Sequence, residues 1–201
     1  MVSRNAPFIQ LPWSRPPPPV GMAPGAEDAV RRALGEDGID RITQTISPGN
    51  LVSMESGGTH LVSGAVDGQP YALAFDLYIA DPATAGDDVR RLRLQGIAAW
   101  QRGPGSPGGE AGNGPHIHCV WPGAKTMNGQ NLEQISSFIH GYRGLSGRGI
   151  SAAAWKDTSI QPDEIAAVRK VYGAVPAHRP VRALTPYEMR HRGRRIPPAL
   201  S

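Results

Sequence analysis

The sequence predicts a mixed α+β domain in which helices pack on one side of a small, largely antiparallel sheet. The segments with strand character are short, and no strand–helix–strand unit long enough for a parallel sheet is repeated along the chain. Gly and Pro, with 25 and 20 copies, make up about a fifth of the 201 residues. That share favours a loop-rich fold over a helical bundle or a coiled coil.

Four segments have the apolar spacing or the end signals of helices. Acidic residues in the first turn or a glycine just past the end mark the first two, an apolar face marks the third, and a proline near its start marks the fourth. They cover residues 26–34, 87–94, 128–142 and 162–172. The side chains expected to face the core from the second and third segments are Val89, Leu92, Leu94, Leu132, Ile135, Phe138 and Ile139.

Three apolar segments are predicted to be strands, at residues 71–79, 97–101 and 117–121. The first is rich in aromatic residues and has Asp76 in its interior, so we expect a mostly buried strand. The residues from Gly103 to Gly114 form a loop of low complexity between the second and third strands.

The chain is expected to have four parts: a proline-rich lead-in (1–25), a compact domain (26–150), a helical extension (151–175) and an arginine-rich tail (176–201). The net charge is +4, of which the tail holds +5, from six arginines and one glutamate, so the other residues sum to −1. Such a tail can contact an anionic polymer, or serve as a solubilising end or a docking peptide. The near-neutral body argues against specific nucleic-acid binding.

The sequence has no apolar stretch of the ~18 to 20 residues that a membrane span needs. Its first residues lead into proline-broken sequence, so no conventional secretory signal is expected. A single cysteine, Cys119, excludes an intrachain disulfide and an all-cysteine zinc site. A transition metal would therefore need histidine and carboxylate ligands.

The pair His116 and His118 is the strongest candidate for such a site. Side chains two apart in a strand point to the same face, so both imidazoles would share one face while Cys119 turns to the core. A catalytic zinc takes three protein ligands. His60, Asp67 and one of the two paired histidines supply two imidazoles and a carboxylate, and the other histidine would move protons. Asp76 is an alternative ligand or a buried structural aspartate.

His-x6-Asp at residues 60–67, followed about 50 residues later by His-x-His at 116–118, resembles the family of zinc D-Ala-D-Ala carboxypeptidases and L-alanyl-D-glutamate endopeptidases. Those enzymes share a fold with the hedgehog signalling domain. The similarity covers roughly residues 30–145, is closest to cell-wall peptidase-like domains of actinobacteria and their phages, and rests on SGGTHLVSGAVD (56–67), GIAAWQR (96–102) and GPHIHCV (114–120).

The resemblance implies that His60, Asp67 and His118 bind Zn²⁺ and that His116 assists catalysis. It also implies that Arg41 holds the substrate carboxylate or the oxyanion. The implied activity is zinc-dependent hydrolysis of a peptide bond in peptidoglycan stem peptides or cross-links. A protein of this kind is made in the bacterial cytoplasm, by host or phage genes, and reaches the wall by a holin, an injection device or another unconventional route.

The sequence departs from the family at the general base. Many members carry an acid three residues before the last zinc-binding histidine, where this chain has Pro115; three before His116 stands Asn113. The base is then His116, Glu110 of the loop, or missing. A missing base would make the domain an inactive zinc-binding module that recognises wall peptide or a protein partner. The lesser candidates are Trp100, Tyr71 and Trp121 as cleft or core aromatics, and His140, His178 and His191 as surface histidines.

Overall fold

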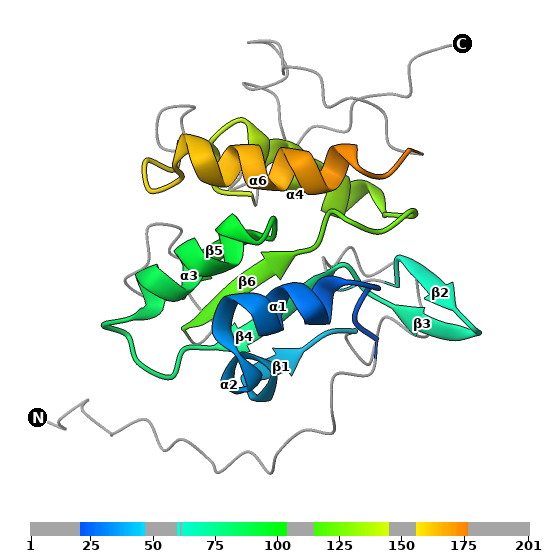
Figure 1. Cartoon of the computed structure of the whole chain (residues 1–201), viewed down its shortest axis with the longest axis horizontal. Coiled ribbons are helices and arrows are strands. Elements are labelled where there is room, and N and C mark those ends of the chain that lie inside the picture. The colour runs from blue at the N-terminus through cyan, green and yellow to red at the C-terminus, as the bar shows by residue number, and fades with distance from the viewer. Residues whose placement is uncertain (1–20, 47–59, 61, 104–114, 145–155, 177–201) are drawn as a thin grey trace, which may run out of the picture.

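The computed structural model describes residues 21–46, 60, 62–103, 115–144 and 156–176. At its centre is an antiparallel sheet of four strands in the order β1-β4-β6-β5, and beside it β2 and β3 form a separate hairpin (Figure 1). The α+β class expected from the sequence is confirmed. The strands are β1 (Ile42–Gln44), β2 (Gly64–Val66), β3 (Gln69–Tyr71), β4 (Ala74–Tyr78), β5 (Ala98–Arg102) and β6 (His116–Val120).

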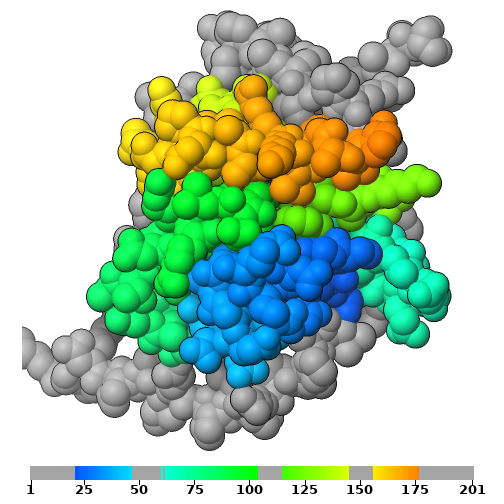
Figure 2. Space-filling view, in the orientation of Figure 1, coloured from blue at the N-terminus to red at the C-terminus, as the bar shows by residue number. Residues whose placement is uncertain are grey.

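Helices pack against the sheet and against one another. α1, α3 and α6 lie one beside the next across the face shown in Figure 2, as blue, green and orange bands. α4 contacts β5 and β6, and α6 contacts both α3 and α4. The helices are α1 (Ala26–Leu34), α2 (Glu36–Asp40), α3 (Ala85–Leu94), α4 (Gly129–Ile139) and α6 (Pro162–Gly173).

Strand pairing gives the sheet one apolar face and one polar row. Asp76 of β4 is paired with His118 of β6, which is paired in turn with Trp100 of β5. Because side chains alternate along a strand, these three project to the same face. The neighbouring row on the opposite face is fully buried and consists of Phe75, Cys119 and Ala99. Cys119 is therefore a core residue, as its position beside the two histidines predicts.

The four predicted helices are all present, with ends shifted by a few residues. α6 has proline at its first position, and a capping box joins Gln161 and Glu164. α4 begins at Gly129 after the N-cap residue Asn128, whose side chain accepts a hydrogen bond from the Asn131 amide, and it ends at Ile139 rather than at residue 142. The predicted strand 71–79 is interrupted, because β3 ends at Tyr71 before β4 begins.

Two of the seven side chains predicted to face the core are exposed. Leu94 is 41% exposed at the last position of α3, and Leu132 is 39% exposed on α4. The buried face of α4 begins with two polar residues, Asn131 and Gln134, and continues with Ile135. Leu132 lies outside this face. The other five side chains are buried as predicted: Val89, Leu92, Ile135, Phe138 and Ile139.

Within the described ranges no helix is long and apolar enough to cross a bilayer. The lead-in through residue 20 and the tail from residue 177 lie outside the described residues. The helix expected within the 151–175 extension is α6, and it packs against α3 and α4 of the predicted compact domain.

Candidate metal centre

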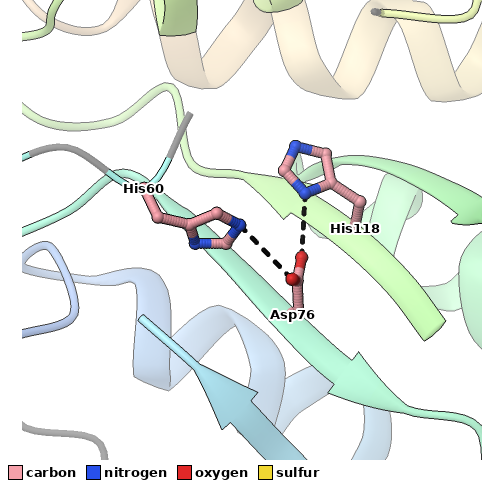
Figure 3. Close-up of side chains that lie close together, drawn as sticks. All are labelled: His60, Asp76 and His118. Atoms are coloured by element: carbon pink, nitrogen blue, oxygen red, sulfur yellow. Dashed lines mark hydrogen bonds and ion pairs between the residues drawn. The ribbon is translucent and has the colours of Figure 1, made fainter. Parts of the chain in front are cut away.

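Three side chains from separate parts of the chain meet on the polar side of the sheet. They are His60, which precedes β2, Asp76 in the middle of β4 and His118 in the middle of β6 (Figure 3). One possible ligand atom of each lies within 4.8 Å of the other two. The residues are 8%, 8% and 3% exposed, respectively, so the group is largely shielded from water.

The Asp76 carboxylate contacts both imidazoles. Its Oδ1 lies 2.8 Å from Nδ1 of His118, and its Oδ2 lies 3.3 Å from Nε2 of His60 (Figure 3). Figure 3 shows both rings turned toward the carboxylate from their own segments of chain. Each imidazole therefore presents one nitrogen to Asp76 and has a second nitrogen on its far side.

The far nitrogens are held by amide oxygens. Nδ1 of His60 lies 2.9 Å from the carbonyl oxygen of Thr45, and Nε2 of His118 lies 2.8 Å from Oε1 of Gln134. Because an amide oxygen only accepts hydrogen bonds, both far nitrogens carry the hydrogen and donate it. In a neutral ring the nitrogen facing Asp76 then presents a lone pair, so two lone pairs and a carboxylate face one another. A cation between them, a proton or a metal ion, resolves this repulsion.

The electrostatics keep the carboxylate ionised. Burial raises the pKa of Asp76, but the hydrogen bonds and positive charge that His118 and His60 supply when they are protonated outweigh burial and hold this pKa well below its usual range. Burial also disfavours protonated His60, yet the hydrogen bond and charge of Asp76 outweigh it, and the pKa of His60 is raised. For His118 burial dominates over Asp76, and its pKa is lowered. Asp76 is thus an anion beside at least one neutral imidazole at neutral pH.

The donor set fits a divalent transition metal. Two imidazole nitrogens and one carboxylate oxygen make a usual three-ligand set for catalytic zinc. The same set also occurs with iron(II). Histidine ligands commonly donate their other N–H to a carbonyl or carboxylate, which fixes the tautomer and the ring. The carbonyl oxygen of Thr45 and Oε1 of Gln134 accept these hydrogen bonds from His60 and His118, respectively.

His116 lies at the edge of this group. It is on the same face of β6 as His118, as the His-x-His spacing predicts, and its Nε2 is 4.0 Å from Oδ1 of Asp76. Its side chain is half-buried, whereas that of His118 is almost fully enclosed. His116 is therefore the histidine of the pair with access to both Asp76 and the surface.

Asp67 lies elsewhere, in the turn between β2 and β3. It is exposed, and it is followed by Gly68, with φ values of 50° and 78°. Two successive positive φ values with Asp-Gly are typical of a type I′ hairpin turn. This hairpin is inserted between His60 and β4, so the carboxylate that reaches the histidines is that of Asp76, nine residues farther along.

Arg41, expected at the substrate, is bound within the fold. Its Nη1 lies 2.7 Å from Oδ2 of Asp88 on α3, and its Nε donates to the carbonyl oxygen of Tyr78 at 2.9 Å. These contacts join the end of α2 to α3 and β4.

The aromatic residues have different surroundings. Trp100 stacks on His118, with ring centroids 6.2 Å apart and the planes 24° apart. Tyr71 hydrogen-bonds Thr126 through its hydroxyl, and Trp121 donates to the carbonyl oxygen of Pro24.

The other sequence candidates are distant from the centre or outside the described residues. His140 caps α4, and its Nδ1 donates to the carbonyl oxygen of Ser136. Glu110, Asn113, His178 and His191 lie outside the described residues.

Comparisons with known proteins find no counterpart: no family model matches the chain, no curated protein matches its sequence significantly, and no solved structure matches its fold significantly. The functional argument therefore depends on the residues of the centre and their geometry.

Proposed function

We propose that the chain is a zinc-dependent hydrolase whose metal ligands are His60, Asp76 and His118. One observation carries the proposal. Two buried imidazoles, each with its outer N–H held by an amide oxygen, direct their inner nitrogens at one buried carboxylate. Two neutral imidazoles and one carboxylate leave a zinc centre with a net charge of +1, which favours the activation of water.

Zinc bound to this set would supply a Lewis acid and a water polarised toward hydroxide. The protein contributes the rest. Asp76 fixes the distance between the two imidazoles, and Thr45 and Gln134 fix their tautomers. Trp100 stacks on one face of His118 and helps to orient its ring. His116 is placed to take a proton at Nε2 and return it, the role of a general acid and base.

The proposed substrate is a peptide bond of peptidoglycan stem peptides or cross-links. The support is the order of the ligands along the chain, histidine, aspartate and then His-x-His, which resembles the zinc carboxypeptidases and endopeptidases of the cell wall. In this proposal Asp76 takes the ligand position that spacing alone gives to Asp67.

Metal analysis tests the centre. We expect about one zinc per chain in the wild type after loading and dialysis, and strong loss in His60→Ala, Asp76→Ala and His118→Ala. Asp67→Ala is the matched control and should keep its zinc, because that side chain stands in an exposed turn. Wild-type protein that binds no zinc overturns the proposal, and preferential retention of iron redirects it to redox chemistry.

Digestion of purified peptidoglycan tests the reaction. We expect the zinc-loaded protein to release new amino groups, and we expect this release to be lost in His116→Ala with the zinc content unchanged.

The competing function is a zinc-dependent recognition module. The observation in its favour concerns the general base. Among the described residues the carboxylate in this group is that of Asp76, and it is a proposed zinc ligand, so it does not serve as a separate base. Zinc-loaded wild type that binds wall peptides and never cleaves them would establish that function.

A further inference from the structure

A cavity of about 290 Å³, lined mostly by polar and charged residues, lies at the outer edge of β5, and none of the three proposed zinc ligands lines it. β5 is the last strand of the sheet, and α3 and α6 flank this region (Figure 1). The volume is close to the lower limit of small-molecule pockets, so it suits a small ligand or one end of a larger one. Four arginines contribute to its lining: Arg90, Arg93, Arg102 and Arg143.

The two lining arginines that come from α3, Arg90 and Arg93, are neutralised by the protein. Nη1 of Arg93 lies 3.2 Å from Oε2 of Glu164, and its Nη2 lies 3.6 Å from Oδ2 of Asp157. Arg90 pairs with Glu164 at 3.0 Å and with Asp163 at 2.9 Å. Glu164 and Asp157 also line the cavity, and their charges are already balanced by these two arginines.

The charges of the other two lining arginines, Arg102 and Arg143, are balanced differently. Nη2 of Arg102 donates to the carbonyl oxygen of Arg143 at 2.6 Å, and its guanidinium lies 5.5 Å from the centre of the Trp100 ring. Arg143 has no ion pair within the described part of the chain, and its Nε is buried and donates no hydrogen bond there. A buried guanidinium N–H without an acceptor destabilises the protein, because it has lost its hydrogen bonds to water. An anion in the cavity would supply that acceptor.

We propose that this cavity binds the carboxylate or phosphate group of a small anionic ligand, with Arg143 as its principal donor. Arginine presents a planar fork of N–H groups that matches either anion in a bidentate arrangement. Trp100 lines the cavity and also stacks on His118, so the anion site and the proposed zinc centre share one side chain. The anion site does not depend on zinc.

Titration calorimetry on the full-length chain, stripped of metal with EDTA, tests the site. The probes are inorganic phosphate and acetate at constant ionic strength, with chloride as the reference anion. Saturable binding of phosphate or acetate is expected, at least tenfold weaker in Arg143→Gln. Tighter phosphate binding identifies a phosphate site, and tighter acetate binding a carboxylate site. Arg32→Gln, a change at an exposed arginine outside the cavity, is the matched control.

Two further variants separate binding from folding. Arg143→Lys keeps the charge without the Nε–H, and we expect an intermediate affinity and an unchanged melting temperature. His60→Ala, at a proposed zinc ligand that does not line the cavity, should bind the anion as the wild type does, so that failure of the zinc proposal leaves this one standing. Anion binding equal in wild type and Arg143→Gln, or no saturable binding of either probe, overturns the inference.

Discussion

Gln134 is a single residue on which the chemistry of His118 depends. Its Oε1 accepts a hydrogen bond from Nε2 of His118 at 2.8 Å, and the residue is 2% exposed. Without that acceptor the neutral imidazole can place its hydrogen on Nδ1, the atom that faces Asp76. The ring would then satisfy the carboxylate by itself and present no lone pair to a metal. Gln134 is thus a positioning residue for the centre.

We predict that Gln134→Leu weakens zinc binding about 10- to 100-fold, the usual effect of removing a hydrogen-bond partner from a ligand. Gln134→Glu, which restores an acceptor, should bind zinc at least as well as the wild type. Competition with a fluorescent chelator measures both affinities. Leu132→Ala, at an exposed position of the same helix, serves as the control. Equal affinity in Gln134→Leu and wild type would remove Gln134 from the centre.

At the scale of elements, α4 shows which part of the structure is predictable. Its existence and its buried Ile135 and Phe138 follow from apolar spacing. That spacing also selected Leu132, because apolar residues are the usual markers of a buried face. The helix instead buries Asn131 and Gln134, since polar groups of the centre and its surroundings need partners. Hydropathy does not reveal a buried face that is polar for this reason.

Tertiary structure is also needed to decide between Asp67 and Asp76 as the candidate carboxylate ligand. Asp76 stands in an apolar strand opposite His118, a position that reads as a structural aspartate until the strands are paired. Strand register is a tertiary property and is not visible in spacing. The Asp-Gly pair at residues 67 and 68, by contrast, is a local signal for a hairpin turn that the sequence itself contains. The His-x-His spacing alone predicts that His116 and His118 share one face of a strand, whereas the position of His60 beside them depends on the tertiary structure.

A pair of substitutions on α4 tests its assigned orientation. Ile135→Ala should lower the free energy of unfolding by about 2–5 kcal/mol, because Ile135 is fully buried and the change leaves a cavity. Leu132→Ala should change it by about 0.5 kcal/mol or less, as is usual at the surface. Urea unfolding of both variants in EDTA gives the comparison. Equal losses would mean that α4 packs with a different face.

For the whole molecule, buried charge joins α6 to the sheet. Arg93 of α3 is 3% exposed, and its Nε donates to the carbonyl oxygen of Ala99 in edge strand β5 at 2.8 Å. Its guanidinium also pairs with Glu164 of α6, which is 1% exposed. Burial lowers the pKa of Arg93 despite these carboxylates. One side chain thus connects α3, β5 and α6.

We predict that Arg93→Met destabilises the protein by about 3–5 kcal/mol, since the change leaves Glu164 buried near Asp157 with one cation fewer. The double variant Arg93→Met/Glu164→Met should recover part of that loss, because it removes both members of the pair. Chemical unfolding of the two single variants and the double variant gives the coupling energy. Additive losses would show that the pair does not join the helices.

The centre also links the stability of the whole molecule to pH and to metal. The raised pKa of His60 means that its protonated form stabilises the fold below its ordinary value of about 6.5, and that this contribution is lost as the pH rises through the folded value. The lowered pKa of Asp76 acts at acidic pH. The ionised carboxylate stabilises the fold above about pH 4, and this contribution is lost as the pH falls through the folded pKa.

A proton and a metal ion therefore compete for the space between His60 and Asp76. We predict that zinc raises the melting temperature little at pH 5.5 and increasingly above pH 6.5, because metal binding releases the proton. At a free zinc concentration 100 times the dissociation constant, the gain corresponds to about 2.7 kcal/mol. Burial lowers the pKa of His118, so the protonation of His118 affects stability in the opposite direction to that of His60. The matched variant is therefore His60→Gln, which removes the group with the raised pKa and leaves His118 in place. Thermal melts with zinc and with EDTA should show this pH-dependent gain in the wild type and little of it in the variant. A zinc effect that is constant from pH 5.5 to 8 would contradict the competition of proton and metal for the space between His60 and Asp76.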